Sequence, residues 1–242
     1  MKKFLPIILF LVGILVVVIT FFVVKNKLQK PAVEEEESAL IEVSLNERPI
    51  ASLTPSEDGH YLNLLVDKIV IDAESMDYEL LYTTGAGLTQ GVPGMVVLSG
   101  RDSFEAELLL GSESSGKFRY DEGVEEGSLT LKFRNNKGKL LAKFSTDFHL
   151  QSNIDQLTSL DGKFSYEFDK TPNGFFVTME TFGIPGSTPS EVANDPYGVF
   201  TSSENELSGK VTGVSHLWTG SEWESLDNGN SSDIGIFVRI GE

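Results

Sequence analysis

From residue 40 onward, apolar and polar side chains alternate with a period of two. The clearest run places Phe104, Ala106, Leu108 and Leu110 alternately with Glu105 and Glu107. Similar runs occur at 76–82, 128–133 and 140–149. Because successive side chains of an extended strand point to opposite faces, each run predicts a strand with one buried and one solvated face. Strands of this kind are typical of antiparallel sheets.

Two pairs of runs are joined by segments with turn chemistry. Arg134–Gly138 joins 129–133 to 140–148 and contains two Asn residues and one Gly, which tolerate positive φ. Lys170–Gly174 joins 164–168 to 175–179, and Pro172 suits the first central position of a turn. We therefore expect a β-hairpin at each place.

Two glycine-rich segments are interpreted as connections between strands. Gly85–Gly91 lacks the Gly-Lys-Ser/Thr of a phosphate-binding loop, and Val92-Pro-Gly94 continues it, so we expect a long turn. Gly111–Gly116 lacks the Gly-x-Ser-x-Gly of a serine-hydrolase turn, so we expect a hairpin loop there.

Together these patterns predict an all-β chain. Turn signals about every ten residues favour an antiparallel β-sandwich-like domain of the immunoglobulin-like or fibronectin-like kind. The segment 152–159 interrupts the alternation. We therefore expect a sandwich at 39–150 and a second, smaller β unit at 160–242 that packs on the first or continues it.

The N-terminal residues follow a different pattern. A tip of residues 1–3 precedes an uncharged apolar run over residues 4–24, which is long enough as a helix to cross a bilayer. Residues 25–38 form a charged linker that includes four consecutive Glu. We expect a single-pass signal anchor in the cell membrane with the domain on the extracytoplasmic side. The alternative of a cleaved signal peptide is disfavoured by the length of the apolar run.

Charge and cysteine content narrow the function. All 36 acidic residues lie after residue 30, together with 14 basic ones, so this part of the chain carries a formal charge of −22. Such a surface repels phosphate backbones, and we expect no nucleic-acid binding. The absence of cysteine excludes disulfides, thiol nucleophiles and cysteine-ligated metals.

The segment 227–233 is dense in oxygen ligands. Asp227, Asn230 and Asp233 are the residues that we would assign to a weak calcium site, because calcium binds six to eight oxygen atoms. The spacing does not match an EF-hand loop. A polar hairpin turn is the favoured interpretation, and Ca²⁺ is the only cofactor that the sequence suggests.

Trp218 and Trp223 are the candidates for a ligand platform. They flank Thr-Gly-Ser-Glu, which places them on two neighbouring strands. An exposed indole can stack on a sugar ring, but two facing tryptophans more often form a core pair. Asp147 and His149 leave the same face of one strand, and we interpret that face as solvent-exposed rather than as a metal site.

These observations indicate a binding or structural role in the cell envelope. We expect contacts with the lipid bilayer through residues 4–24 and with an envelope glycan or protein through loops. No catalytic motif is present, so we expect no enzyme activity. The alternatives are an anchored hydrolase with a dispersed site and a cytoplasm-facing partner of a membrane complex.

Overall fold

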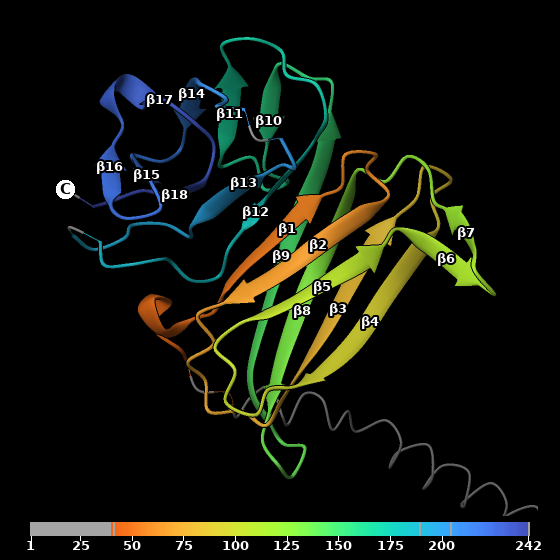
Figure 1. Ribbon diagram of the computed structural model, residues 1–242. Helices are drawn as coiled ribbons and strands as arrows, with labels where there is room; N and C mark the ends of the chain where they lie inside the picture. Colours follow the sequence, from red (N-terminus) through yellow and green to blue (C-terminus); the bar gives the residue numbers. More distant parts are fainter. Residues whose placement is uncertain (1–39, 41, 189, 204, 242) are drawn as a thin grey trace, which may run out of the picture. The chain divides into compact units, whose positions relative to one another are not determined.

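The computed structural model describes residues 40, 42–188, 190–203 and 205–241, and it is all-β as the alternation predicted (Figure 1). Residues 41–242 form one compact unit. Every strand pair in the described chain is antiparallel. Two short 3-10 turns are present: η1 (Leu45–Glu47) precedes the first strand, and η2 (Asp227–Gly229) lies near the C-terminal end of the described chain.

A nine-stranded sheet runs through the whole unit. Its order is β16 (Trp223–Ser225), β15 (His216–Trp218), β18 (Ile236–Val238), β13 (Tyr197–Phe200), β12 (Phe175–Glu180), β9 (Leu140–Ser152), β8 (Glu126–Arg134), β3 (Ser75–Thr83) and β4 (Thr89–Val97).

Three smaller sheets complete the fold. The first consists of β1 (Ile50–Pro55), β2 (Tyr61–Asp67) and β5 (Phe104–Leu109). The second consists of β10 (Gln156–Thr158), β11 (Ser165–Phe168), β14 (Gly209–Thr212) and β17 (Asn230–Ser231). The third is a hairpin of β6 (Gly111–Ser114) and β7 (Lys117–Tyr120).

The first two small sheets cover opposite faces of the long sheet, as the register of β12 shows. Val177 of β12 belongs to the first hydrophobic core and pairs with Phe200, which packs against the same core. Thr178 follows on the other face and pairs with Val199, which belongs to the second core. Because residues that pair directly share a face, β12 has one core on each side.

The two cores therefore lie on either side of one shared sheet. The first packs β1–β2–β5 on β3, β8 and β9 through fully buried residues such as Leu62, Leu80 and Phe133. The second packs β10–β11–β14 on β12, β13 and β18 through aromatic residues such as Tyr166 and Phe237. Burial of large apolar side chains is the main stabilising contribution in both.

The hairpin expected around Arg134–Gly138 is confirmed. β8 and β9 pair with each other, and the Asn135 carboxamide oxygen accepts the backbone N–H groups of Lys137 and Lys139 at 2.9 and 3.0 Å. The hairpin expected at Gly111–Gly116 is confirmed. Its connection is shorter than expected, because residues 111–114 belong to β6 and only Ser115 and Gly116 form the turn. Ser115 and Gly116 both have positive φ, the conformation of a two-residue hairpin turn, between β6 and β7.

The hairpin expected across Lys170–Gly174 is wrong. β11 pairs with β10 and β14, whereas β12 pairs with β9 and β13. The segment is a crossover between sheets, and the rings of Phe168 and Phe176 contact each other with centroids 5.2 Å apart. Local alternation predicts both strands correctly. The two strands do not pair within one sheet, however; they lie in different sheets whose aromatic side chains pack against each other.

The long turn expected over Gly85–Gly94 is confirmed only for its first part, because the chain turns between β3 and β4 at residues 84–88. Residues 89–97 form β4, which pairs with β3 along its whole length. Pro93 is accommodated because β4 is an edge strand, where a missing N–H can face solvent. The Tyr78 ring packs over Gly94, where a Cβ atom would lie only 2.1 Å from that ring.

The predicted tip, anchor and linker at residues 1–3, 4–24 and 25–38 lie outside the described residues. Within the part of the chain that is described, no helix has the length and apolar character needed to cross a membrane.

Candidate binding site

A stack of three rings stands exposed at one end of the first core. His60 and Tyr120 are nearly parallel, with ring centroids 3.9 Å apart and 9° between planes. Phe118 continues the stack on Tyr120, with centroids 6.2 Å apart and 9° between planes. We call these three residues the aromatic ladder. Phe118 is 52% exposed and Tyr120 37% exposed, which is unusual for large rings in a protein with two well-filled cores.

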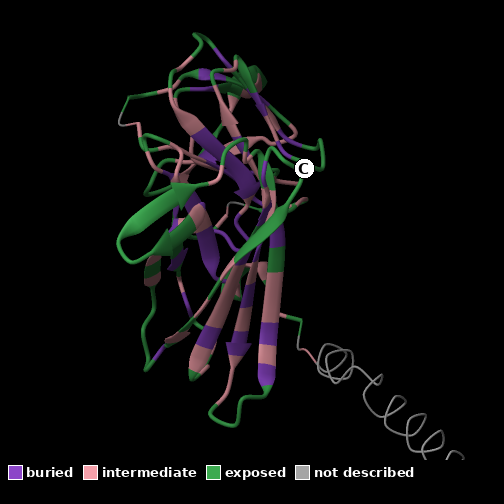
Figure 2. Cartoon of the chain, turned by 90° about the vertical axis from the view of Figure 1, so that its right-hand side faces the viewer, coloured by how far each residue is buried: buried purple, intermediate pink, exposed green. Residues whose placement is uncertain are grey.

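The hairpin β6–β7 positions the ladder. All four residues of β7 are exposed. Figure 2 colours exposed residues green and buried residues purple. At the base of the hairpin, the backbone N–H of Leu110 donates to the His60 carbonyl at 2.8 Å. The N–H of Asp121 donates to the Leu110 carbonyl at 2.9 Å. These bonds place Tyr120 beside His60.

Tyr61 closes the inner side of the ladder. Its ring meets Tyr120 edge to face, with centroids 6.1 Å apart. A hydrogen bond between the two side chains, with burial as the next cause, raises the pKa of Tyr61 to about 12. The Tyr61 hydroxyl is therefore neutral at physiological pH and can take part in hydrogen bonds as donor or acceptor.

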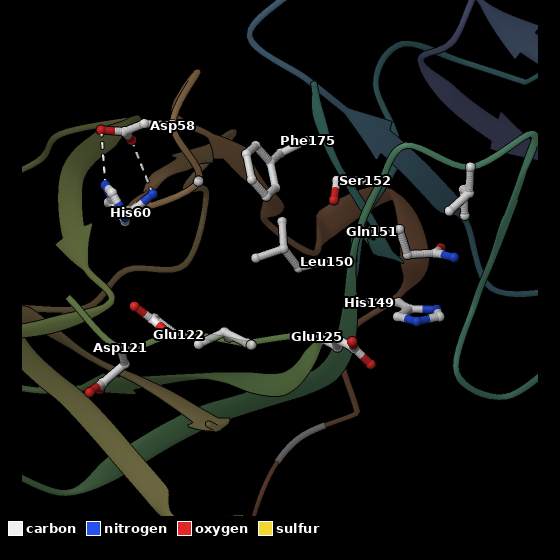
Figure 3. A pocket seen from close by; sticks show the side chains of 14 residues that line it. Asp58, His60, Asp121, Glu122, Glu125, His149, Leu150, Gln151, Ser152 and Phe175 are labelled. Atoms are coloured by element: carbon white, nitrogen blue, oxygen red, sulfur yellow. Dashed lines mark hydrogen bonds and ion pairs between the residues drawn. The ribbon is translucent and has the colours of Figure 1, made fainter. Parts of the chain in front are cut away.

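A pocket of about 500 Å³ lies next to the ladder (Figure 3). Its acidic lining residues are Asp58, Asp121, Glu122 and Glu125. Leu150 and Phe175 point into the space between Asp58 and the segment 121–125, and they form its apolar floor. No Lys or Arg is among the described residues that line it.

The turn between β1 and β2 fixes the Asp58 carboxylate. Oδ1 accepts the Ser56 hydroxyl at 2.7 Å and the His60 backbone N–H at 3.1 Å, and Oδ2 lies 3.0 Å from His60 Nδ1. The Ser56 hydrogen bond is the largest cause that lowers the pKa of Asp58 to about 2, so this carboxylate is ionised at neutral pH. Gly59 has positive φ, and a Cβ there would lie 2.6 Å from the Phe175 ring.

The segment from Asp121 to Glu125 forms the opposite wall. Tyr82 donates its hydroxyl to Asp121 Oδ2 at 2.8 Å. The N–H of Gly85 donates to the Glu122 carbonyl at 2.8 Å, and the Gly85 and Gly123 backbones are in close contact. A second hollow, of about 910 Å³, lies between this segment and the turn from Thr84 to Leu88 and shares Asp121, Glu122 and Gly123 with the pocket.

The two histidines of the pocket have different surroundings. His60 is part of the ladder, while His149 leaves the far side of β9, where its Nδ1 lies 2.8 Å from the Thr158 carbonyl oxygen. Asp147 and His149 do share a face of β9, and Asp147 is exposed.

The aromatic ladder and the pocket together can bind a ligand through ring faces, acidic side chains and an apolar floor.

A smaller cleft, of about 290 Å³, lies over the second half of the long sheet and contains Asp147, Asp161 and Glu180. Burial, followed by the charges of Asp195 and Asp161, raises the pKa of Glu180. Burial also favours a raised pKa for Asp161, but hydrogen bonds from Ser159, Tyr197 and Lys163 outweigh it and hold the pKa of this carboxyl well below its usual range.

Trp218 and Trp223 do face each other on neighbouring strands. They pair directly across β15 and β16, with ring centroids 5.3 Å apart. Both are partly buried, and Trp223 Nε1 donates to the Pro185 carbonyl at 3.2 Å. A Cβ on Gly186 would lie 2.6 Å from the Trp218 ring, so the segment 185–186 already contacts both indoles.

The predicted calcium ligands have local partners. Asp233 Oδ1 accepts the backbone N–H groups of Leu207 and Ile234 at 3.0 and 2.8 Å. Asp227 Oδ1 accepts the Asn228 carboxamide at 3.0 Å, and Asn230 begins β17. Among the described residues, no group of three or more His, Asp or Glu side chains is arranged to hold a metal ion. Calcium binding at Asp227, Asn230 and Asp233 stays a prediction.

Sequence reasoning missed the ladder and the pocket. The one local signal was Lys117–Tyr120, where basic and aromatic residues alternate in a short run with no aliphatic residue. Such a strand carries charged side chains on one face and aromatic rings on the other. The structure exposes both faces of this strand. The approach of His60 to Tyr120 joins residues 60 positions apart, and no local pattern predicts it.

No protein-family model, curated protein or solved structure matches this chain.

Proposed function

We propose that this chain is a membrane-anchored binding protein of the cell envelope. Residues 4–24 are the anchor, residues 25–38 are a charged tether, and the β domain lies on the extracytoplasmic side. The uncharged apolar run of residues 4–24 supports the anchor. The packing of β1–β2–β5 on the long sheet supports a sandwich of the immunoglobulin-like or fibronectin-like kind.

The aromatic ladder carries the binding proposal. Rings that could have been buried stand at a projecting hairpin, beside a pocket with an apolar floor and a polar wall. Exposed rings next to a hollow are the usual form of a ligand or partner site, because ring burial supplies affinity and the polar groups supply orientation.

Retention of the full-length chain on the envelope fraction of its own cells tests the proposal. We expect the wild-type chain, in neutral detergent micelles, to be retained. Tyr120→Ser should weaken retention about tenfold, because loss of a ring at the centre of an interface typically costs more than 1 kcal/mol. Met95→Ser is the matched control, since Met95 is 66% exposed on β4 and outside the ladder.

Equal retention of Tyr120→Ser and Met95→Ser would show that the ladder is not the binding surface. Failure of the wild-type chain to be retained would remove the envelope-binding function altogether.

A second candidate function, an anchored hydrolase, is favoured by the cleft at Glu180. A carboxyl group with a raised pKa beside an ionised carboxylate is the pairing used in general acid–base hydrolysis. Asp161, however, already accepts hydrogen bonds from the Ser159 hydroxyl, the Lys163 backbone N–H and the Tyr197 hydroxyl, which is typical of a structural carboxylate. Hydrolysis of nitrophenyl glycosides that Glu180→Gln abolishes and Glu105→Gln retains would support this candidate. Absence of hydrolysis by the wild-type chain would remove it.

A further inference from the structure

We infer that the ligand of this site is a cationic polypeptide segment whose Lys or Arg side chains enter the acidic pocket and lie against the aromatic ladder. This inference rests on the proposed binding function and specifies the chemistry of its partner.

The charge of the pocket is the first argument. Four acidic residues, Asp58, Asp121, Glu122 and Glu125, line a hollow whose described walls contain no Lys or Arg. A cleft lined by charges of one sign focuses the field and concentrates ions of the opposite sign. The low pKa of Asp58 keeps at least this carboxylate ionised over the whole physiological range.

The ladder adds the second argument, which is independent of the carboxylates. Phe118 and Tyr120 are exposed large rings, and Tyr120 stacks on His60, which lines the pocket. A guanidinium or ammonium group is attracted to an aromatic face, and its alkyl stem packs well on partly exposed apolar surface such as Phe175. Rings and carboxylates together match a long basic side chain better than either does alone.

The extent of the surface favours a polypeptide over a small amine. The pocket and the second hollow adjoin across Asp121–Gly123, and their volumes are about 500 and 910 Å³. Arg119 lines only the second hollow, so that hollow carries mixed charge and suits polar groups between basic residues. A segment with spaced basic side chains can fill both hollows at once.

The same charges argue against an anionic ligand. A phosphate-containing polymer would meet four acidic lining residues at the pocket and a surrounding chain that carries a formal charge of −22 after residue 30. Repulsion of this kind lowers the association rate and the affinity. A neutral glycan is the remaining competitor, because carboxylates also accept sugar hydroxyl groups.

Fluorescence anisotropy with the full-length chain in neutral detergent micelles tests the inference. The probes are a dye-labelled peptide of alternating Arg and Gly, the same peptide with citrulline in place of Arg, and a dye-labelled N-acetylglucosamine oligomer. We expect only the Arg peptide to bind, with an affinity that falls as salt is raised. The double variant Glu122→Gln/Glu125→Gln should weaken binding at least about tenfold and reduce the salt dependence.

Two further variants separate the contributions. Tyr120→Ser should also weaken binding of the Arg peptide but leave its salt dependence largely unchanged, because the ring carries no charge. Glu105→Gln removes an exposed carboxylate on β5 outside the pocket and should bind like the wild type.

The outcomes distinguish this inference from the function on which it rests. Binding of the citrulline peptide or the oligosaccharide as tightly as the Arg peptide would overturn the cationic ligand. Envelope retention that depends on Tyr120 without any affinity for the Arg peptide would overturn it too, while the binding function stands. A wild-type chain that shows neither envelope retention nor binding of the Arg peptide would overturn both the binding function and the cationic ligand.

Discussion

Asp161 links the two layers of the second core through its carboxylate. It lies in the turn between β10 and β11, where it accepts the Ser159 hydroxyl at 2.6 Å and the Lys163 backbone N–H at 3.1 Å. The same carboxylate accepts the Tyr197 hydroxyl from β13 at 2.7 Å. One ionised group therefore fixes a turn of the small sheet and holds that turn to the long sheet.

Asp161→Asn should lower the free energy of unfolding at neutral pH by about 1–3 kcal/mol, the usual value of a hydrogen bond to a charged group. The folded pKa of Asp161 is depressed, so its stabilising effect is present above the unfolded pKa of about 4 and is lost as the pH falls through the folded pKa. The difference between wild type and variant, measured by urea denaturation, should therefore be smaller at about pH 3 than at about pH 7.

Asp72→Asn, at an exposed aspartate between β2 and β3, is the control and should leave the free energy of unfolding unchanged at both pH values. A constant difference for Asp161→Asn across this pH range would mean that the carboxylate acts through its shape rather than its charge.

At the scale of elements, β9 and β12 connect the two cores. The two strands pair from Phe148–Met179 to Ser152–Phe175 within one continuous sheet. Val177 packs in the first core, and its neighbour Phe176 packs in the second. Because β12 contributes residues to both cores and is hydrogen-bonded to β9, which contributes to the first, disrupting one core also removes the support of the other.

We therefore expect residues 41–242 to unfold in a single cooperative transition. Leu131→Ala in the first core and Leu157→Ala in the second should each lower the free energy of unfolding by about 2–5 kcal/mol, because both side chains are fully buried. Both variants should shift the same transition. The fluorescence of Trp218 and Trp223 reports on the second half of the unit, and circular dichroism reports on all strands.

Coincident fluorescence and circular dichroism curves would support one cooperative unit. Two transitions, with Leu131→Ala affecting only one and Leu157→Ala only the other, would instead show that the two halves fold independently.

For the whole molecule, the side of the membrane on which the β domain lies decides between the functions considered. The chain has no cysteine, so a single introduced one can be labelled without background. Ser187 is exposed on the segment between β12 and β13. We expect Ser187→Cys to react with a membrane-impermeant maleimide in intact cells, because the anchor is predicted to keep its N-terminus inside.

Lys3→Cys, in the predicted N-terminal tip, is the opposite-side control and should react only after lysis. The reverse pattern would place the β domain in the cytoplasm. It would replace the envelope-binding function with the second alternative, a cytoplasm-facing partner of a membrane complex.

The sequence by itself determined the all-β class, several of the longer strands and the hairpin at Arg134–Gly138. These features are local, since alternation reports which side chains are buried and turn residues report where the chain can reverse. The proline in β4 misled the prediction for 89–94, because Pro93 excludes a central strand but not an edge strand.

Only the tertiary structure decided which strands pair and which rings meet. Alternation marked β11 and β12 correctly, yet it could not show that they lie in different sheets, because burial does not specify the partner. The two cores on opposite faces of one sheet, and the approach of His60 to Tyr120 beside the acidic pocket, depend on contacts between residues distant in the chain. Such contacts follow from how the sheets pack and not from any local pattern of residues.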